Sequence, residues 1–583
     1  MPSLPDGALS AKGRRRALDA LGSGELDLIV IGGGITGAGA ALDAAARGLN
    51  VGLVEARDLA SGTSSASSKL IHGGLRYLEM GDIGLVREAL RERELLLTRL
   101  APHLVAPVPF LWPLRRRGWE RAYIGAGLVL YDTIGGARSV PRHRHLSRRG
   151  ALAVAPALRH DALCGALQFH DAAEDDARMV AVVARTAAAR GAYIATRTRV
   201  AGFRRTEGRV TGVNAVDEET GEELVLRARH VATAAGVWTD ELRALAGGAS
   251  SWRVVPSKGI HIFVAADRIP METGVLARTE KSVLFIIPWG GGWLIGDTDT
   301  QWSSAPDEPV ATRADIDYVL AKANALLAAP LSREDIHGVT VGLRPLLAGG
   351  AASDTTRISR RDVVESPAPG LTTIAGGKYT TYRVMAARLV DAAARALGAS
   401  NPSVTEDVPL LGAAGLPAAR RGREAFAARA GVSAAAIDAL IERYGDRVQE
   451  LVALIEARPE LAEPLDGARQ HLRAEVVYAC THEGALRLED VLARRTRLAL
   501  TAPDRGLAAA DQTAALMAET LGWSAARTQA EVETWGARIA AQRAGEAEPD
   551  DTSALAAFGA TLADRRQAEG GLASAEKRGT RLS

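Results

Sequence analysis

Three glycines, Gly32, Gly34 and Gly37, stand between an apolar run and a stretch rich in small residues. In the spacing G-x-G-x-x-G, the first glycine makes a tight turn, the second lets a pyrophosphate approach the backbone, and the third lets strand and helix pack closely, with the phosphates at the helix N-terminus. A second apolar run ends in Glu55, 21 residues beyond Gly34, where a carboxylate can accept the 2′-hydroxyl of an adenosine ribose. The spacing predicts a dinucleotide site, and the carboxylate argues against NADP, whose 2′-phosphate it would repel.

The elements that must position these residues indicate which dinucleotide binds. From Asp27 the pattern is strand, glycine turn, helix to about Arg47 and a second strand over 50–54, which is the opening of a parallel α/β sheet. A later strand over 230–236 ends in Ala-Thr-Ala-Ala-Gly, with Gly236 last. This is a loosened version of the Ala-Thr-Gly strand that closes the FAD site of flavoproteins with two dinucleotide-binding motifs. The predicted cofactor is therefore FAD rather than NAD.

The composition of the 583 residues, 47% hydrophobic and 24% charged, is typical of a globular chain with two or three domains. A formal net charge of +2 gives no overall attraction to nucleic acid, so none is expected as a partner. Cys164 and Cys480 are the only cysteines, which excludes a disulfide framework or a cysteine-rich metal site and fits the cytoplasm. No signal peptide and no apolar run of ~18 residues is present, so the chain is not expected to span a membrane.

Changes in residue composition and in the spacing of apolar residues divide the chain into parts. Residues 1–25 are expected to be a flexible lead-in that can include one short helix, and 26–400 an α/β region. After about residue 405, Ala, Leu, Arg and Glu recur at helical spacing, which predicts a separate helical domain over 405–542. Residues 543–583 contain few large apolar side chains, which predicts a loose tail.

The segment over 64–79 reads SSASSKLIHGGLRYLE. Five further blocks follow it: Lys258–His261, Ile287–Trp289, Gly296–Asp299, Gly342–Leu346 and Gly376–Arg383. In this order, over roughly residues 26–540, the six blocks closely resemble the FAD-dependent glycerol-3-phosphate dehydrogenases of aerobic respiration. Six ordered blocks are far more specific than a glycine-rich turn alone.

The resemblance implies a fold and a division into domains. The fold would be a glutathione-reductase-like FAD-binding Rossmann domain, an interleaved substrate domain with a mixed sheet, and a C-terminal all-helical domain. The FAD domain would be built from about 26–100, 155–250 and 350–400. The substrate domain would take about 101–154 and 251–349.

The resemblance also implies contacts to FAD. The residues expected to make them are Gly32, Gly34, Gly37, Glu55, Ser64, Ser65, Ser68, Lys69, His72, Gly73, Gly236, Gly376, Gly377 and Thr380. Lys69, Lys258 and Lys378 all lie in Gly-rich or Ser-rich motifs of a chain that otherwise prefers arginine. Because lysine and arginine substitute poorly for each other at a tight site, at least two of the three lysines are expected to be functional.

The implied substrate is glycerol 3-phosphate, whose phosphate is largely a dianion near neutral pH and calls for cationic partners. Arg76, Arg344 and Lys378 match positions where the family binds phosphate or lines the substrate pocket, and Tyr77 stands next to Arg76. Gly-rich or Pro-flanked turns hold the three cations at expected strand ends, where ligands bind in α/β folds. The alternative for any single arginine is a solvated surface charge.

Oxidation of an alcohol by a flavin passes the C2 hydrogen to flavin N5 as hydride and needs a base for the hydroxyl proton, commonly histidine. His261 aligns with the base proposed for the family, and His72 lies in the segment expected near the flavin ring. For both, the alternative is a structural histidine with satisfied hydrogen bonds. His261, Arg344 and Lys378 form the expected catalytic set.

Two other features have competing interpretations. Glu174-Asp175-Asp176 resembles a metal or acid–base cluster, but consecutive side chains diverge, so a capped and solvated helix start is predicted, and no metal. Residues 114–149 surround the apolar run 122–131 with arginines, which fits either an amphipathic surface on anionic lipid or a buried helix with a charged rim.

The sequence thus predicts a glycerol-3-phosphate dehydrogenase that passes electrons to a membrane quinone, in the cytoplasm and peripheral on the inner face of the cell membrane. A glycerol-3-phosphate oxidase that reduces oxygen to hydrogen peroxide is the first alternative. A non-catalytic FAD-binding protein is the second, encouraged by the altered strand before Gly236. The oligomeric state is not determined, and a homodimer stays open.

Overall fold

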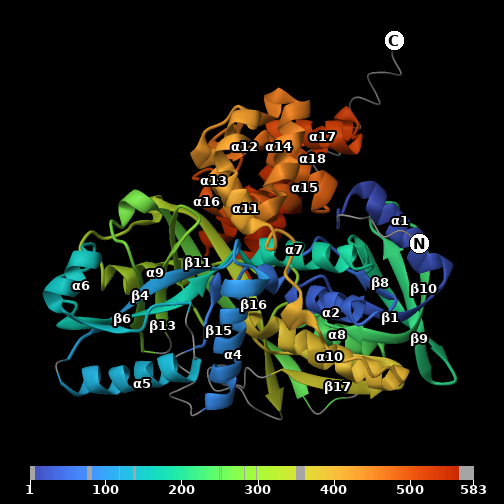
Figure 1. Cartoon of the computed structure of the whole chain (residues 1–583), viewed down its shortest axis with the longest axis horizontal. Helices are drawn as coiled ribbons and strands as arrows, with labels where there is room; N and C mark the ends of the chain where they lie inside the picture. Colours follow the sequence, from blue (N-terminus) through green and yellow to red (C-terminus); the bar gives the residue numbers. More distant parts are fainter. Residues whose placement is uncertain are drawn as a thin grey trace.

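The computed structural model describes residues 7–74, 82–116, 118–135, 139–248, 250, 252–280, 283–296, 298–349 and 362–563. Arg76 and Tyr77 lie outside the described residues. Figure 1 shows three parts: a sheet with its helices on the right, a second sheet with its helices on the left, and a group of helices above both. This matches the expected combination of a Rossmann domain, an interleaved mixed-sheet domain and a helical domain.

The first sheet has eight strands, six of them in the order β17-β18-β10-β1-β2-β7, and β8 and β9 extend it from β10. Strand β1 runs parallel to both β2 and β10, and its residues 28–31 are all buried because helices or strands cover both faces. The strands are β1 (Glu25–Ile31), β2 (Val51–Val54), β7 (Tyr193–Ala195), β8 (Thr198–Thr206), β9 (Arg209–Asp217), β10 (Glu223–Thr233), β17 (Val363–Ala368) and β18 (Leu371–Ala375).

The helix after the glycine turn, α2 (Ile35–Ala46), packs against α7 (Asp176–Ala189) and α10 (Tyr382–Leu397). Its small residues allow this close approach: a Cβ on Gly39 would stand 3.0 Å from the Tyr382 ring. Three segments far apart in sequence therefore meet at one helix. The Rossmann part is therefore assembled from separate segments of the chain.

The N-terminal segment contains the short helix that the sequence allowed, but this helix is packed on the fold and is not part of a flexible lead-in. Residues 11–23 form α1 (Ala11–Ser23), which buries Leu18 and Leu21 against the first sheet. Arg14 fixes the helix further, donating 2.7 Å to the backbone oxygen of Thr196 and 2.5 Å to Asp217. The sequence allows this helix, but the strands β7 and β10 that it packs against lie far along the chain and give no local signal.

The second sheet has ten strands, eight of them in the order β15-β11-β14-β13-β12-β4-β6-β3. It begins with the short β3 (Leu70–Ile71) and is dominated by the long antiparallel pair β11 and β16. The other strands are β4 (Ala106–Leu114), β5 (Arg144–Ser147), β6 (Gly165–Ala173), β11 (Trp252–Ala265), β12 (Gly274–Arg278), β13 (Val283–Trp289), β14 (Gly292–Gly296), β15 (Thr300–Gln301) and β16 (Ile336–Gly349). The helices around it are α4 (Ile83–Leu95), α5 (Trp119–Gly135), α6 (Arg148–Val154) and α9 (Arg313–Asn324), while α8 (Thr239–Leu245) follows β10.

One domain boundary falls later than predicted. Strand β6 pairs with β4 over nine residues, and the Phe110 and Phe169 rings stack across the pair at 5.9 Å between centroids. Residues 155–173 therefore belong with the second sheet and not with the FAD domain. A strand's partner is set by long-range pairing, which the local pattern does not reveal.

The helical domain has its own apolar core, formed by residues between Leu416 and Ile539. Its helices are α11 (Leu416–Arg421), α12 (Arg423–Ala430), α13 (Ala434–Tyr444), α14 (Val448–Ala457), α15 (Arg473–His482), α16 (Leu498–Thr501), α17 (Ala510–Leu521) and α18 (Ala525–Glu546). A small hairpin, β19 (Pro464–Leu465) with β20 (Ala468–Leu472), is the one departure from the all-helical prediction within the described part of this domain.

The segment after α18 was predicted to be a loose tail, but its described residues are packed on the fold. Residues 551–563 are helical, and Ala554 and Phe558 are buried against Val310 and Ala541. Asp551, at the start of this helix, pairs with the buried ammonium of Lys258, which also binds Asp315 at 2.6 Å. Ala554 and Phe558 are enough to hold this helix in place because they pack on a surface that the rest of the fold already forms.

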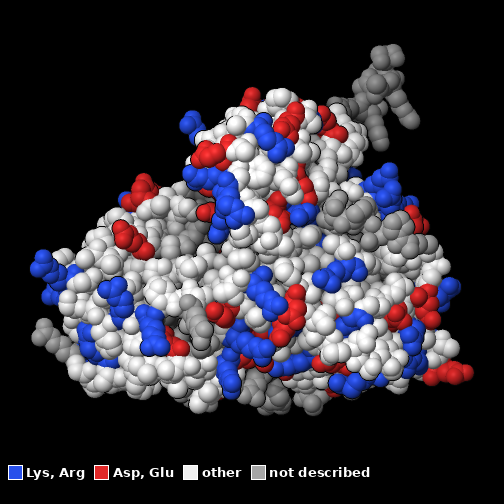
Figure 2. Space-filling model, in the orientation of Figure 1, with Lys and Arg blue, Asp and Glu red and all other residues white. Residues whose placement is uncertain are grey.

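Charges of both signs are interspersed over the face shown in Figure 2. Across the described ranges, no helix combines the length and the apolar character needed to cross a bilayer. Helix α5 exposes an apolar stripe nevertheless, with Trp119, Tyr123 and Leu130 at helical spacing and 61%, 52% and 41% exposed.

Candidate active site

A cavity of about 1360 Å³ lies between the two sheets and is lined from both. Most of the residues predicted to bind cofactor or substrate meet in its wall: Gly32, Gly34, Glu55, Ser64, Ser68, His72, Gly236, His261, Arg344, Gly376, Gly377, Lys378 and Thr380. The cavity exceeds the ~300–1,000 Å³ of ordinary small-ligand sites. Its size and its glycine turn fit a dinucleotide.

The glycine turn is required by close backbone approaches. Gly32 has φ +113°, and a Cβ there would lie 2.6 Å from the backbone oxygen of Ala234. A Cβ on Gly37 would collide with the backbone oxygen of Gly32, so Gly37 packs the helix on the strand and does not line the cavity. Gly34 precedes the first turn of α2, where Ile35 N donates to Ser64 Oγ at 3.0 Å. The loosened strand end at Ala234 thus still packs on the turn.

Glu55 stands at the end of β2 and faces the turn. Its Oε2 accepts from Gly33 N at 2.6 Å, and its Oε1 accepts from Arg57 N at 2.8 Å. Burial raises the pKa of Glu55 above its ordinary value, and these two N–H groups offset part of the rise. A carboxylate has further lone pairs, so both oxygens can still accept a ribose hydroxyl.

The loop over 61–69 contributes only some of its predicted cofactor-binding residues to the cavity wall. Ser64 and Ser68 line the cavity, whereas Ser65 and Lys69 do not. Lys69 is fully buried, donates 2.7 Å to Ser65 O and 2.7 Å to Asp176, and burial lowers its pKa to about 8. The structure therefore places Ser65 and Lys69 outside the cavity wall, although both were expected to bind the cofactor. Lysine fits here because a compact charge is enclosed on all sides.

The acidic run after β6 is the partner of this lysine. Asp175 caps α7 by accepting from Arg178 N at 3.2 Å, as predicted for a helix start. Asp176 and Glu174 are buried, however, so the run is not solvated. Burial and the neighbouring Asp176 raise the pKa of Glu174 well above its ordinary value.

A buried cluster supports the segment around His72. His72 lines the cavity, and its backbone N donates to Thr380 Oγ1 at 3.2 Å. Gly73 lies behind the wall, donating 2.8 Å to Tyr131 Oη, which in turn donates 2.6 Å to Asp171. Helix α5, which carries Tyr131, thereby holds the backbone next to the expected flavin segment.

The predicted catalytic set comes from two long strands and from the segment after a third, so that His261 and Arg344 lie within strands and Arg344 is not at the strand end that was expected. His261 on β11 is 2% exposed, lines the cavity, and its Nε2 is 2.9 Å from Ser68 Oγ. Arg344 on β16 pairs in register with Ser257, and its Nη2 donates 3.0 Å to Thr298 O. Lys378 follows β18 and the left-handed Gly376 and Gly377. The structure brings all three to one cavity.

Two parts of the wall were not found from the sequence. Phe110, Trp112, Ile124, Phe169 and Leu276 form an apolar region that reaches Tyr123 and Leu130 of α5. At the end near Glu55, the wall includes Trp238 and Arg197. Alternation along β4 and β6 could have suggested the apolar set, but only pairing shows which face borders the cavity.

Known proteins resemble this chain along most of its length. The model of the family described as FAD dependent oxidoreductase matches residues 27–383, and the model described as C-terminal domain of alpha-glycerophosphate oxidase matches 403–528. Glycerol-3-phosphate dehydrogenase 2 of Mycobacterium tuberculosis is 50% identical over 551 residues, 94% of each chain. The mitochondrial glycerol-3-phosphate dehydrogenase of Mus musculus is 36% identical over 88% of this chain and 72% of its own.

Solved structures agree with this relationship. The glycerol-3-phosphate dehydrogenase from Bacillus halodurans, solved in complex with FAD, superposes with a TM-score of 0.77 at 30% identity, over 91% of this chain and 98% of that one. The L-alpha-glycerophosphate oxidase from Mycoplasma pneumoniae shares the fold, with a TM-score of 0.52 at 18% identity. FAD is the cofactor of this fold and family, and the glycine turn, Glu55 and the size of the cavity fit it. The chain is an FAD-dependent oxidoreductase, and it belongs to the FAD-dependent glycerol-3-phosphate dehydrogenase family.

Proposed function

We propose that this chain oxidises sn-glycerol 3-phosphate to dihydroxyacetone phosphate and passes the electrons to a membrane quinone. The observation that carries the proposal is the convergence of His261, Arg344 and Lys378 on the cavity that also contains the glycine turn and Glu55. The names of the relatives that are 36–50% identical support the choice of substrate.

Substrate binding would rest on two cations of different kinds. A phosphate dianion is neutralised best by groups that donate several charge-assisted hydrogen bonds. Arg344 is oriented by Thr298 O, by Ser257 Oγ at 3.4 Å and by the nearby Asp299, so its planar group presents a defined edge. Lys378, after two glycines, adds a compact charge. Arg76 and Tyr77 remain proposed contacts.

The proton step would belong to His261. FAD, when bound, accepts the C2 hydrogen as hydride at N5. His261 would accept the proton of the C2 hydroxyl, because imidazole is basic near neutral pH and lies in the cavity wall. The 2.9 Å contact with Ser68 Oγ fixes the ring orientation. His72, on the neighbouring segment, would contact the cofactor instead.

The apolar region of the wall supports a quinone as acceptor. It runs from the cavity to α5, whose exposed Trp119, Tyr123 and Leu130 form one helical face. Arg115 and Arg116 are exposed just before this helix. An apolar stripe bordered by arginines is typical of a helix that lies in the interface of an anionic membrane. We therefore propose peripheral attachment through α5, where a lipid-soluble acceptor is available.

Oxygen is the second candidate acceptor. The match of the helical domain to a model named for an oxidase favours it, because that match covers 403–528. A non-catalytic FAD-binding protein is disfavoured by the retention of His261, Arg344 and Lys378 in one cavity.

Anaerobic mixing separates these possibilities. Glycerol 3-phosphate should bleach the flavin absorbance of the purified protein, and a soluble quinone analogue should restore it faster than air-saturated buffer does. Faster reoxidation by oxygen, with stoichiometric hydrogen peroxide, would make the chain an oxidase. A flavin that glycerol 3-phosphate does not bleach would refute the proposed substrate.

A further inference from the structure

A short stretch of the helical domain lies against the loop that follows Glu55. This stretch comprises the π-helical turn Asp490–Arg495 and the residues up to α16. It carries Arg494, Arg495 and Arg497, all buried, and none of the three lines the cavity. π-helical turns are rare and concentrate at functional sites.

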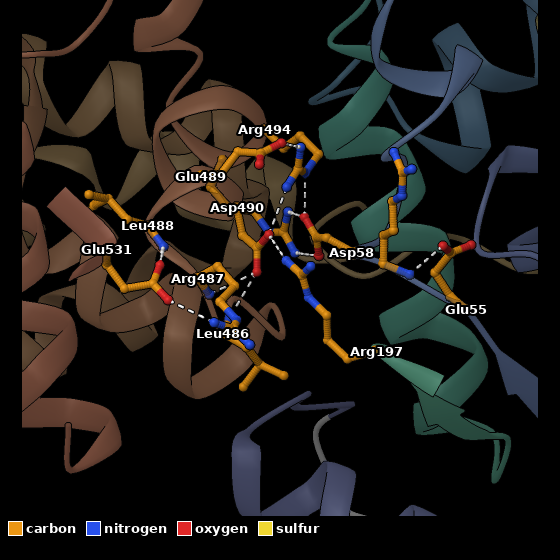
Figure 3. Close-up of polar contacts among 12 residues, drawn as sticks. Glu55, Asp58, Arg197, Leu486, Arg487, Leu488, Glu489, Asp490, Arg494 and Glu531 are labelled. Atoms are coloured by element: carbon orange, nitrogen blue, oxygen red, sulfur yellow. Dashed lines mark hydrogen bonds and ion pairs between the residues drawn. The ribbon is translucent and has the colours of Figure 1, made fainter. Parts of the chain in front are cut away.

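Arg494 binds Asp58, three residues beyond Glu55 (Figure 3). Arg495 binds the same carboxylate. Arg495 makes a bidentate contact, with Nη1 and Nη2 each 2.8 Å from a different carboxylate oxygen, and Arg494 Nε adds a third bond at 2.6 Å. Burial alone would raise the pKa of Asp58, but the charges of Arg495 and Arg494 outweigh it and hold the pKa well below its ordinary value.

Asp58 lies in the loop that wraps the glycine turn. Two residues on, Ala60 N donates to Gly33 O at 3.0 Å, and Gly33 N in turn donates to Glu55. Arg197 N donates to Arg57 O at 2.8 Å, while the Arg197 side chain donates 2.6 Å to Asp490 of the helical domain. Figure 3 shows Asp58 and Arg197 beside Asp490 and Arg494 of the helical domain.

Arg497 holds the other end of the same loop. It donates to Asp175 at 2.8 Å and to Ser65 O at 3.1 Å, and it pairs with Asp176. Asp176 in turn accepts from Ser67 N at 2.9 Å and from Lys69. The loop over 55–69 is therefore bound at both ends by arginines of one stretch.

The backbone in this region is held in unfavourable conformations. Ala60, Lys69, Arg197 and Arg497 have φ of +60°, +57°, +52° and +62°, although none is glycine. Residues other than glycine keep this left-handed backbone conformation only where their surroundings impose it, and such residues concentrate at functional sites. The surroundings here are the ion pairs just described.

We propose that Arg494, Arg495 and Arg497 are positioning residues for FAD: by fixing the loop over 55–69 around the glycine turn, the docked helical domain sets the affinity for the cofactor. Simple docking would not require such a cluster, since the helical domain has its own apolar core and buried ion pairs add little net stability. Their value lies in selecting one loop conformation. Coupling between the two sites is reciprocal, so bound FAD also strengthens docking of the helical domain.

The test measures release of FAD from the holoenzyme after dilution, followed by the recovery of free-flavin fluorescence. Arg495→Met and Asp58→Asn should each weaken FAD retention by about 5- to 150-fold, the usual range for coupled sites. The double variant should lose little more than the worse single variant, because both remove one contact. Arg429→Met is the matched control: this arginine of the same domain makes an equally bidentate pair with Glu456, but on the surface. It should release FAD as the parent does.

A second measurement separates positioning from damage to the fold. With saturating FAD added, the variants should regain the parental kcat, and the KM for glycerol 3-phosphate should stay unchanged. Parental FAD retention in Arg495→Met and Asp58→Asn, additive losses in the double variant, or a kcat that added FAD does not restore would each overturn the proposal. Should Arg495→Met fail to fold, the nearly isosteric Asp58→Asn decides alone. FAD release is measured without substrate, so the result can be interpreted even if the chain does not oxidise glycerol 3-phosphate.

Discussion

The two ends of the cavity are built differently. Around Glu55, the wall is fixed by backbone hydrogen bonds and by buried ion pairs that link Asp58 to Arg494 and Arg495. Around Leu130, it consists of apolar side chains and of a helix that is exposed on one face. Directional contacts impose one geometry, whereas apolar contacts are non-directional.

This difference suggests a division of labour. The end near the glycine turn would hold a cofactor that stays bound through many turnovers. The apolar end would admit molecules that must enter and leave. His261 and Arg344 line the same cavity, where substrate would meet cofactor.

The strongest test of this division removes the proposed base. His261→Ala should slow reduction of the flavin by glycerol 3-phosphate by roughly 10²–10⁴-fold, the usual contribution of general base catalysis. FAD should stay bound, because His261 does not contact the glycine turn. Stopped-flow absorbance and flavin content measure the two effects. His72→Ala is the comparison and should alter the flavin spectrum more than the rate; a His261 variant within a few-fold of the parent would move the base elsewhere.

Replacing Arg344 tests whether this arginine binds the phosphate of the substrate. Arg344→Met should cost about 1.5–3 kcal/mol in kcat/KM for glycerol 3-phosphate, the usual range for hydrogen bonds to a charged group. Glycerol lacks the phosphate and should lose far less. Steady-state kinetics with both substrates measure the difference, and equal losses would mean that Arg344 supports the fold through Thr298 and Ser257.

Replacing Glu55 tests the end of the cavity near the glycine turn directly. Glu55→Arg should weaken FAD retention by about tenfold or more, because a charged hydrogen bond to the ribose is lost and a bulky cation takes its place. The N–H groups of Gly33 and Arg57 would also lose their acceptor. Flavin content after gel filtration reports the result. Retention equal to that of the parent would remove Glu55 from the cofactor site.

The smallest expected effect concerns the exposed face of α5. Changing Arg115 and Arg116 to Gln should weaken binding to anionic vesicles by roughly 1 kcal/mol per residue. Binding of the parent protein to the same vesicles should fall as the salt concentration rises. Activity in detergent should be unchanged. Sedimentation with phosphatidylserine and phosphatidylcholine vesicles measures this. Equal binding to both lipids would show that charge plays no part in attachment.

Local sequence signals predicted the part of the site that depends on local geometry. Gly32, Gly34 and Glu55 follow a spacing dictated by one strand–turn–helix unit, and the structure places all three at the cavity. The ordered blocks with His261 and Lys378 located the rest through resemblance. The overall fold was predictable for the same reason.

Long-range contacts account for what the sequence did not reveal. Lys69 was expected to touch the cofactor, but its partner Asp176 lies 107 residues away and encloses its charge. Strand β6 was placed in the wrong domain because its pairing with β4 has no local signature. Nothing in the pattern around Arg494, Arg495 and Arg497 distinguished them from the many arginines of helical surfaces, since their partners Asp58 and Asp175 are far away in the chain.

The distance along the chain between Asp58 and Arg495, 437 residues, has a consequence for biosynthesis. At about 5–20 residues per second, a ribosome makes Arg495 roughly 20–90 s after Asp58. During that time the first strands of the Rossmann part have emerged, but the arginines that fix the loop over 55–69 do not yet exist. The nascent chain should therefore acquire FAD late, after the helical domain has left the exit tunnel, and truncated products that end before it should emerge colourless.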